Sequence, residues 1–243
     1  MAEILGIKID DLTRDEVLEK VEEFLDGDKQ RYIVLPNSEV VVRANRDRYL
    51  REIINNSDLS LSDGRGLFFA TKILGQPIKE QIPGVELIEE LSKRHPKIFL
   101  FGGRKDIVQK AAGNLGPNII DFIDGYQDTD RVVERINQIQ PRILFVGLGV
   151  PKQEKWIADN LIKLPSVRLA IGVGGAFDFI SGRIKRAPKA LRKAGLEWSW
   201  RFLLEPWRAK RIFKAVIVFP WLVIHNRAIY FSEKIRYNSK KGL

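Results

Sequence analysis

The amino-acid sequence predicts an α/β layered domain with a mainly parallel β-sheet, followed by a basic and aromatic helical appendage. Short apolar runs that suit strands alternate with longer runs that suit helices. Several expected strands are continuously apolar, which is typical of a sheet that helices cover on both faces. No internal repeat or low-complexity linker divides the chain. These observations favour one layered domain with a C-terminal extension.

Capping residues and prolines mark the first elements. The run 4–9 is strand-like, and Thr13 followed three residues later by Glu16 forms a capping box for the next helix. A buried strand candidate at residues 32–35 ends at Pro36. Helices are expected at residues 13–25, 38–44, 47–54 and 66–74, and a strand is expected at residues 58–61.

Glycines mark the ends of the later strands. The strand expected at residues 97–101 ends in Gly102 and Gly103, and the strand expected at residues 142–146 ends in Gly147. Further strands are expected at residues 119–123 and 167–171, the second ending in the letters GVGG. Helices are expected at residues 84–94, 106–115, 130–138 and 152–161.

The last quarter of the chain, residues 183–243, carries nearly all of its charge imbalance. It holds sixteen Lys and Arg against three Glu and no Asp, whereas residues 1–182 hold twenty-five basic and twenty-eight acidic residues. Aromatic residues interleave with these cations, a composition that suits an anionic lipid surface and would also suit nucleic acid. The alternative is a helical pair that packs its rings on the body and shows its charges to water.

The apolar content of this segment bears on whether it crosses a membrane. Its longest apolar run, residues 215–224, is ten residues long and is broken by Pro220. Spanning a bilayer takes about 20 residues. We therefore expect the segment to lie on a membrane without crossing it.

Length and composition bound the remaining possibilities. The chain has 243 residues, of which 44% are hydrophobic, so it can build a substantial core. It contains no cysteine, which excludes disulfides and thiolate metal sites. The first ten residues lack a cationic stretch followed by an apolar one, so no signal peptide is expected. We therefore expect the globular body of the protein to lie in the cytoplasm.

Five expected strands end in loops rich in turn residues. In parallel sheets such loops meet helix N-termini at the carboxyl edge, where ligands bind. We therefore expect them to converge on one phosphate-containing ligand, although glycine also simply ends strands. No P-loop motif occurs, and GVGGAF lacks the third glycine of the dinucleotide fingerprint. The loops are at residues 36–39, 62–66, 101–104, 147–154 and 172–178.

Seven motifs follow one another along the chain. They are PNSE at 36–39, SDGRG at 62–66, IPGVEL at 82–87, GLGVPKQEKW at 147–156, GVGGAFDFISG at 172–182, RAP at 186–188 and GLEWSWRFLLEPWR at 195–208. Together they resemble the WecG/TagA/CpsF family of bacterial glycosyltransferases, glycosyltransferase family 26, over essentially the whole chain. The resemblance implies a Rossmann-like nucleotide-sugar-binding catalytic domain at residues 1–194 and a membrane-associating appendage at residues 195–243.

The resemblance also implies an activity. It is the inverting transfer of a sugar, often of N-acetylmannosamine type, from a UDP-sugar donor to a polyprenyl-diphosphate-linked saccharide. The implied place is the cytoplasmic face of the bacterial plasma membrane, in teichoic acid or surface polysaccharide synthesis. The implied partners are these substrates and an anionic membrane surface, with no metal or other cofactor and no nucleic acid. An exposed apolar tail would also be able to form a homo-oligomer.

Inverting transfer requires a base and a means of stabilising the departing diphosphate. Asp63 matches the family carboxylate and is the expected base, although Asp-Gly is also a common turn pair. Asp128 and Asp130 have the spacing of a metal-binding Asp-x-Asp motif, but their place before a helix favours capping. Cationic side chains are then expected to replace the ion, and Arg grips phosphate with two donors.

The resemblance places three arginines of the appendage at the diphosphate: Arg201, Arg208 and Arg211. Their spacing suits one face of an ideal helix, but Pro206 interrupts it, so only Arg208 and Arg211 are expected on one face. The alternative, a solvated basic face, suits Lys210 and Lys214 better.

Other positions are expected to bind the nucleotide. Asp178 matches a family position that recognises uridine, and the nearby glycines let the backbone approach the ligand. Asn37, Tyr126 and Gln153 are further expected contacts of the nucleotide, and each has an equal structural alternative. Asn37 would instead cap the following helix, Tyr126 would lie in the core, and Gln153 would lie on the surface. The remaining expected contacts are Gly172, Gly174 and Gly175.

Two departures from the family pattern lie beside the expected base. Leu35 stands where Thr often precedes the Pro-Asn pair, and Gln81 stands where Arg is often found. Gly64 and Gln81 are the expected sugar or acceptor contacts. The departures bear on the identity of the sugar and the acceptor, and they leave Asp63 in place.

Two functions of other classes remain as alternatives. A nucleotide- or nucleic-acid-binding α/β module would use the basic tail to grip phosphates, with salt-sensitive binding. A non-enzymatic scaffold would bind no UDP-sugar at all.

Overall fold

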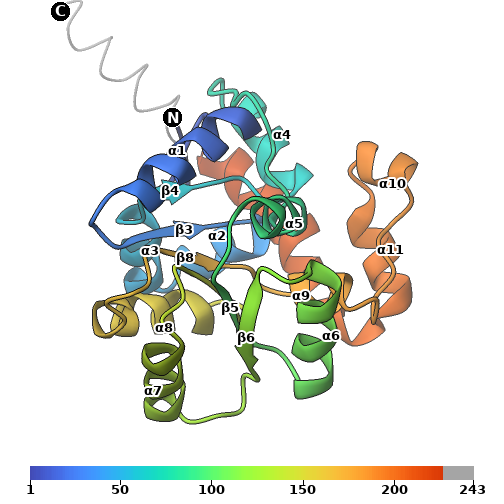
Figure 1. The fold of residues 1–243 in the computed structure, drawn as a ribbon. Coiled ribbons are helices and arrows are strands. Elements are labelled where there is room, and N and C mark those ends of the chain that lie inside the picture. The colour runs from blue at the N-terminus through green and yellow to red at the C-terminus, as the bar shows by residue number, and fades with distance from the viewer. Residues whose placement is uncertain (227–243) are drawn as a thin grey trace, which may run out of the picture.

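The computed structural model describes residues 1–226, apart from the side chains of Lys189 and Lys193. Its centre is a six-stranded parallel sheet with the strand order β4-β3-β8-β7-β5-β6 (Figure 1). The part of the expected appendage beyond residue 226, which contains three of the aromatic residues that interleave with its cations (Tyr230, Phe231 and Tyr237), lies outside the described residues. The strands of the sheet are β3 (Arg31–Val34), β4 (Leu59–Ser60), β5 (Ile98–Gly102), β6 (Ile119–Ile123), β7 (Ile143–Gly147) and β8 (Leu169–Gly172).

Helices cover both faces of this sheet, which explains why its central strands are continuously apolar. One face packs against α1 (Arg14–Asp26), α5 (Gly84–Arg94), α6 (Lys105–Leu115) and α9 (Ala176–Ile180). The other packs against α7 (Thr129–Ile139) and α8 (Lys152–Asn160), with the 3-10 turn Leu161–Lys163. The α/β fold with a mainly parallel sheet is therefore confirmed.

A third apolar cluster lies at the β4 side of the molecule. It joins the hairpin strands β1 (Ala2–Ile4) and β2 (Ile7–Ile9) to α2 (Ser38–Ala44), α3 (Arg48–Asn55) and α4 (Arg65–Ile73). Phe219 and Val223 are also buried in this cluster, each 2% exposed. Part of the C-terminal end of the chain thus belongs to the core of the body.

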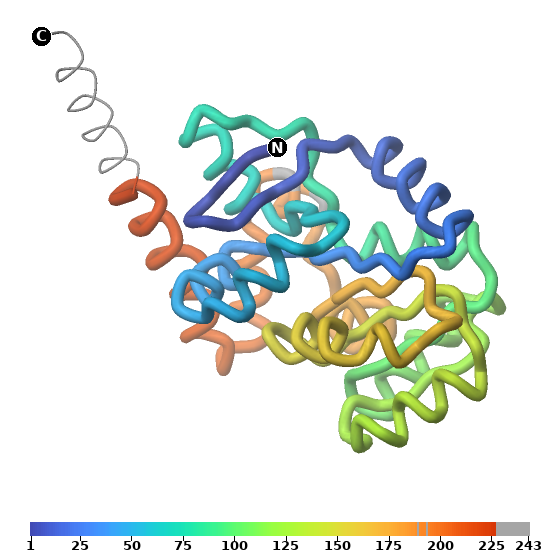
Figure 2. Tube along the Cα trace, turned by 90° about the vertical axis from the view of Figure 1, so that its left-hand side faces the viewer, coloured from blue at the N-terminus to red at the C-terminus, as the bar shows by residue number. Residues whose placement is uncertain are grey.

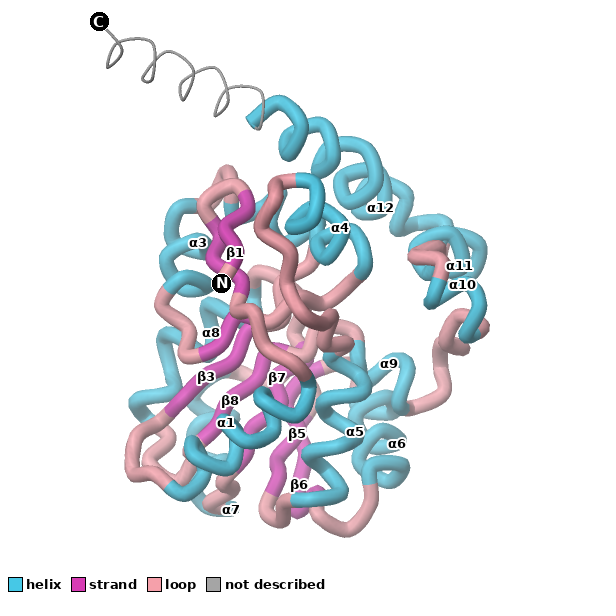
Figure 3. The backbone as a smooth tube through the Cα atoms, turned by 90° about the horizontal axis from the view of Figure 1, so that it is seen from above, coloured by secondary structure: helices cyan, strands magenta, loops and turns pink. Residues whose placement is uncertain are grey.

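The C-terminal arm, residues 189–226, is a succession of short helical segments. Between its first two helices it passes beside α4, where a Cβ added at Gly195 would lie 3.3 Å from Cβ of Arg65. Its π-helix then packs against α2. Figures 2 and 3 show the course of the arm along the outside of the body. Between residues 1 and 226, no helix has the length and apolar character needed to span a bilayer. The segments are α10 (Lys189–Lys193), α11 (Glu197–Leu204), the 3-10 turn Pro206–Arg208, α12 (Ala209–Phe213) and the π-helix Lys214–Val218.

Most element boundaries agree with the sequence within two residues. The capping box of Thr13 and Glu16 is formed, with both hydrogen bonds present. The run 4–9, however, is not one strand, because Leu5 and Gly6 adopt positive φ and turn the chain into an antiparallel hairpin. Helix α9 was not expected, and the arm is segmented rather than a helical pair. The division at residue 195 stays a prediction.

Candidate active site

The expected base, Asp63, lies in the loop that joins β4 to α4, at the carboxyl edge of the sheet. Its backbone N–H donates to the carbonyl of Pro36 at 2.9 Å, which ties the loop to the end of β3. Its Oδ1 lies 3.4 Å from the backbone N–H of Gly84 at the start of α5. The side chain is half-buried. Three elements therefore hold this carboxylate at the carboxyl edge of the sheet.

Burial raises the pKa of Asp63 to about 6. The N–H of Gly84 opposes this shift, Glu197 raises the pKa further, and Arg201 and Arg186 lower it. Residues 197 and 201 belong to the C-terminal arm, so the arm reaches the electrostatic surroundings of the carboxylate. A carboxyl group that titrates near neutral pH suits a general base.

The residues around Asp63 support its loop. Gly64 has φ 111°, a conformation that favours glycine, and begins α4. The N–H of Ile82 donates to the carbonyl of Ser62 at 2.9 Å, which holds the neighbouring Gln81 beside the same loop. The two residues expected at the sugar or acceptor thus both lie beside Asp63.

Leu35 has a packing role here. Its side chain is 8% exposed, and a Cβ added at Gly84 would lie only 2.8 Å from its Cδ1. The side chain therefore fills the space beneath the first turn of α5. In place of a hydroxyl, this chain has an apolar contact that supports the N–H facing Asp63.

Asn37 caps α2, which is one of the two roles that the sequence predicts for it, the other being a contact to the nucleotide. Its side-chain oxygen accepts hydrogen bonds from the N–H groups of Glu39 and Val40. A Cβ added at Gly64 would lie 3.8 Å from Cβ of Asn37. The cap therefore sits beside the loop of Asp63, where it also positions Glu39.

Gln153 lies in the interior, so its expected alternative as a surface residue is wrong. It is 3% exposed, and its Oε1 accepts from the N–H groups of Gly149 at 3.1 Å and Gly174 at 2.8 Å. A Cβ added at Gly172 would lie 2.9 Å from its Nε2. The side chain thus joins the loops that follow β7 and β8, and the glycine at 172 is required by this close approach.

Glu154, beside Gln153, is a buried acid that the sequence analysis missed. It is 3% exposed, and its Oε1 accepts from Nε2 of Gln153 at 2.8 Å. Its Oε2 has no hydrogen-bond partner among the described residues. Burial raises the pKa of this carboxyl to about 7.

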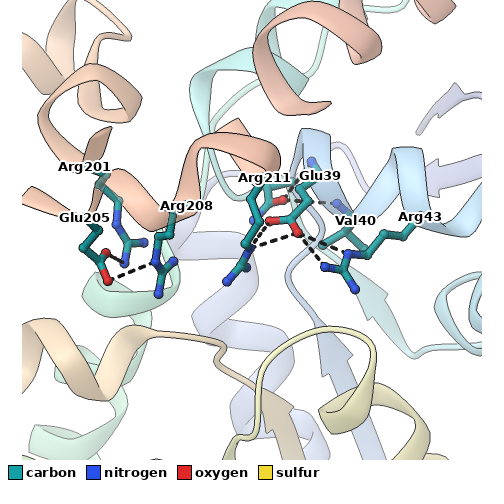
Figure 4. A network of polar contacts seen from close by, with 8 residues as sticks. Glu39, Val40, Arg43, Arg201, Glu205, Arg208 and Arg211 are labelled. Atoms are coloured by element: carbon teal, nitrogen blue, oxygen red, sulfur yellow. Dashed lines mark hydrogen bonds and ion pairs between the residues drawn. The ribbon is translucent and has the colours of Figure 1, made fainter. Parts of the chain in front are cut away.

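Three arginines of the arm converge through two buried carboxylates (Figure 4). Glu205, 5% exposed, contacts Nη2 of Arg201 at 2.9 Å with one oxygen and Nε of Arg208 at 3.0 Å with the other. Glu39 contacts Nε of Arg211 at 2.9 Å. Arg201 and Arg208 thus share Glu205 across the break at Pro206, whereas Arg211 pairs with Glu39 of α2.

Arg201 faces the start of α9, where the expected uridine contact lies. A Cβ added at Gly175 would lie 3.6 Å from Oδ2 of Asp178 and 3.8 Å from Nη2 of Arg201. Asp178 also pairs with Nη1 of Arg183 at 3.0 Å. Burial lowers the pKa of Arg208, as do the neighbouring arginines. The arm and the loop after β8 thus bring several guanidinium groups to one carboxyl-edge surface.

Tyr126 is not a core residue, since it is 78% exposed. It follows β6, and the preceding Gly125 donates its N–H to the carbonyl of Gly103 at 2.9 Å. The side chain therefore lies on the surface near the end of β5, with no contact that joins it to the arginines in the described part of the chain.

The Asp-x-Asp sequence lies at the N-terminus of a helix. Asp128 occupies the N-cap position of α7, as expected, although its side chain makes no capping hydrogen bond. Across residues 1–226, no three His, Asp or Glu side chains are grouped to hold a metal ion.

The glutamates of the site escaped sequence reasoning for different reasons. Glu39 is the last residue of PNSE, and Glu205 directly precedes Pro206 in the motif at 195–208. A carboxylate among arginines, at helix spacing from Arg201 and Arg208, was the available signal for Glu205. Nothing local indicates that Glu39 meets Arg211.

The fold and this site define a class of protein. A parallel sheet that carries, at its carboxyl edge, a carboxylate with a pKa near 6 beside several arginines is equipped to deprotonate a hydroxyl and bind a diphosphate. Those are the requirements of a glycosyltransferase that uses a nucleotide-sugar.

Comparison with known proteins assigns the chain to a family. Residues 2–232 match the family described as "Glycosyl transferase WecG/TagA/CpsF family", and the chain belongs to it. It is 34% identical over 233 residues to an "N-acetylglucosaminyldiphosphoundecaprenol N-acetyl-beta-D-mannosaminyltransferase" of Staphylococcus aureus strain NCTC 8325 / PS 47, with 91% of each chain covered. It is 33% identical, with the same coverage, to the protein of that name from strain MRSA252. The protein is a sugar-transferring enzyme.

Proposed function

We propose that this enzyme transfers N-acetylmannosamine, or a closely related sugar, from a UDP-sugar to N-acetylglucosamine carried on a polyprenyl diphosphate. The names of the relatives that match over nearly the whole chain support this pair of sugars. The single structural observation that carries the proposal is the position of Asp63 near Arg201 of the arm. Burial raises the pKa of Asp63 to about 6, and the charge of Arg201 partly opposes this shift.

In the proposed mechanism, the acceptor hydroxyl gives its proton to the carboxylate of Asp63. Its oxygen attacks the anomeric carbon of the donor from the face opposite the diphosphate. The bond between that carbon and the diphosphate oxygen breaks, and UDP leaves with the electron pair. The new glycosidic bond therefore has inverted configuration.

The arginines take up the charge of the leaving group. Arg201, Arg208 and Arg211 would exchange part of their pairing with Glu205 and Glu39 for hydrogen bonds to the diphosphate. In this proposal no metal ion is required. Asp178, Gly175 and the loop held by Gln153 would contact the nucleotide.

The arm is also the proposed membrane contact. Several of its large apolar side chains are more than 40% exposed, and they accompany exposed cations such as Lys210. Such a surface suits the boundary of an anionic bilayer. In this proposal the enzyme is a peripheral protein on the cytoplasmic face of the plasma membrane. When no membrane is present, the same apolar surface would pair two copies of the enzyme. The exposed side chains include Phe202, Leu203, Trp207, Phe213, Ile217, Trp221 and Ile224.

The nucleic-acid alternative is not favoured. The arginines at 201, 208 and 211 are paired with buried carboxylates. A phosphate-backbone grip relies on cations displayed to the solvent.

The test is a screen of UDP-sugars with a synthetic lipid-diphosphate N-acetylglucosamine acceptor in vesicles, with and without EDTA. We expect transfer of N-acetylmannosamine with inversion and equal rates in both conditions. No transfer from any UDP-sugar, together with no UDP-dependent rise in Tm, would overturn the proposal. Salt-sensitive binding of DNA or RNA that tolerates Asp63→Asn would favour the alternative.

A further inference from the structure

A second group of arginines, which includes Arg186 near Asp63, pairs with a different carboxylate from the arginines of the donor site. Three guanidinium groups, from α1, from the loop after α9 and from α10, meet at the single carboxylate of Glu86 in the first turn of α5. Nη2 of Arg14 lies 3.2 Å from one oxygen, while Nη2 of Arg186 and Nη1 of Arg192 lie 3.1 and 3.3 Å from the other. We call these four residues the Glu86 cluster.

The Glu86 cluster has more positive than negative charge. Its three arginines face one carboxylate, and their side chains are 34, 25 and 26% exposed for Arg14, Arg186 and Arg192. Two further carboxylates lie near Arg14. Glu80 accepts a hydrogen bond from the backbone N–H of Arg14, and the charge of Arg14 lowers the pKa of Glu90. The excess positive charge therefore rests mainly on Arg186 and Arg192.

The hydrogen-bonding capacity of the cluster is also incompletely used. Nε of Arg186 is buried without a partner among the described residues. Arg192 directs its Nε to the carbonyl of Ala187 and Nη1 to Glu86, which leaves Nη2 for another acceptor. A guanidinium carries five N–H donors, and a buried donor without a partner is costly. Together these donors suit a ligand with several anionic oxygens.

The position of the cluster relates it to the chemistry. Glu86 lies two residues after Gly84, whose N–H faces Asp63, and Arg186 is close enough for its charge to lower the pKa of Asp63. Arg201 acts on the same carboxylate from the donor side. One arginine of the Glu86 cluster and one arginine of the proposed donor site therefore both act on Asp63.

We infer that the Glu86 cluster binds the diphosphate of the lipid-linked acceptor. This inference rests on the proposed function. The acceptor sugar carries its reacting hydroxyl and its diphosphate on one ring, so with the hydroxyl at Asp63 the phosphates would reach Arg186 and Arg192 across that ring. The exposed apolar side chains of Leu196 and Trp198 follow α10 directly, 41 and 40% exposed, and give the hydrocarbon chain a surface to follow.

The experiment compares two soluble acceptors in the full-length enzyme. One is N-acetylglucosamine on a short-chain lipid diphosphate, and the other carries the same sugar and chain on an uncharged linker. For Arg192→Gln and Arg186→Gln we expect KM for the diphosphate acceptor to rise about tenfold or more, because a charge-assisted contact is lost. KM for the UDP-sugar and KM for the uncharged acceptor should change by less than about twofold.

The control is Arg135→Gln, which removes the same charge from α7 on the far face of the sheet, where Arg135 pairs with Asp121 at 2.7 Å. Its KM for both acceptors should equal that of the wild type. Equal losses on both acceptors in Arg192→Gln, or no loss on the diphosphate acceptor, would overturn the inference and leave the proposed function standing.

A membrane headgroup is the other source of phosphate. Binding of wild type and Arg192→Gln to phosphatidylglycerol vesicles without acceptor should be equal. Weaker vesicle binding by the variant, with an unchanged KM for the soluble diphosphate acceptor, would assign the cluster to headgroups and overturn the inference. If the wild type transfers no sugar, calorimetric binding of the two acceptors without donor still tests the cluster, so the two failures are distinguishable.

Discussion

Glu39 and Arg211 are 172 positions apart in the chain, yet both oxygens of the carboxylate accept from Nε of the guanidinium, at 3.0 and 2.9 Å. The same carboxylate accepts from Arg43 within α2. Glu39 follows the capping residue Asn37 by two positions, so the pair connects the arm to the loop that ends β3. The position of the arm is thereby coupled to the carboxyl edge of the sheet.

Disrupting this pair should weaken the attachment of the arm. Arg211 is 43% exposed, so screening limits the coupling energy with Glu39 to about 1 kcal/mol. It is measured by a double-mutant cycle of Glu39→Gln and Arg211→Gln, with urea unfolding of the four proteins. The cycle on Arg48 and Glu52, whose side chains are 86 and 51% exposed, is the control and should give a smaller coupling. Equal couplings in the two cycles would contradict the prediction.

The role of Asp63 predicts a pH dependence. A base acts only when it is deprotonated, so kcat/KM should fall as the pH decreases through about 6. Asp63→Asn should lower kcat by a factor of about 100 to 10,000 or more, and the acid limb should disappear from any residual activity. The UDP-dependent rise in Tm should remain, because the base does not hold the nucleotide. An unchanged acid limb in the variant would assign it to another group.

If Arg208 holds the diphosphate, the affinity for UDP should depend on this side chain and should not depend on metal ions. Arg208→Gln removes a charge-assisted contact to the diphosphate, so the affinity for UDP should fall about tenfold to a hundredfold. Added Mg²⁺ should not restore it, and EDTA should not affect the wild type. Lys210→Gln, which removes an exposed charge two residues away, is the matched control. Calorimetric titration with UDP measures all of these, and tight binding of Mg²⁺ with UDP would contradict the expectation.

The buried Glu154 predicts that stability depends on pH. Its pKa is raised from 4.5 to about 7 in the folded protein, so the folded state favours the protonated carboxyl. The stability of the wild type should therefore decrease as the pH rises from about 4.5 through about 7. Glu154→Gln, which does not titrate, should be more stable than the wild type by up to about 3 kcal/mol at pH 8 and by much less at pH 5. Chemical unfolding at the two pH values measures this difference, and equal differences would contradict it.

Phe219 predicts that the arm is part of the cooperative fold. The side chain is 2% exposed in the cluster that contains the β1–β2 hairpin. Phe219→Ala should reduce the free energy of unfolding by about 3–5 kcal/mol. Exposed Trp221→Ala, two residues later and 60% exposed, should change it little. A truncation at Gly195 removes this core contact together with the arginines, so point substitutions are the cleaner test of catalysis.

Much of the fold was predictable because its signals are local. The capping box at Thr13, Pro36 after β3 and the glycines after β5 and β7 each act within a few residues, and the structure confirms the elements that they delimit. The loop of Asp63 was located in the same way. The turn at Leu5 and Gly6 was missed because one continuous apolar run contains both hairpin strands.

The contacts of the site were predictable only in part. The three arginines of the arm were identified by resemblance, whereas their carboxylate partners Glu39 and Glu205 were not. Whether Gln153 lies on the surface or in the interior depends on how closely the loops after β7 and β8 approach each other. A periodicity of two or 3.6 residues contains no information on that approach.

By itself, the sequence determined most of the strands and helices of the body, the covering of the sheet on both faces, the excess charge of residues 183–243 and the membership of a glycosyltransferase family. Only the tertiary structure decided that Glu39 meets Arg211, that Glu86 gathers arginines from three elements, and that Phe219 enters the core. Backbone preferences and hydrophobic periodicity act over a few residues and are written in the local sequence. Ion pairs between residues 100 or more positions apart form only where packing of the whole chain brings the charges together.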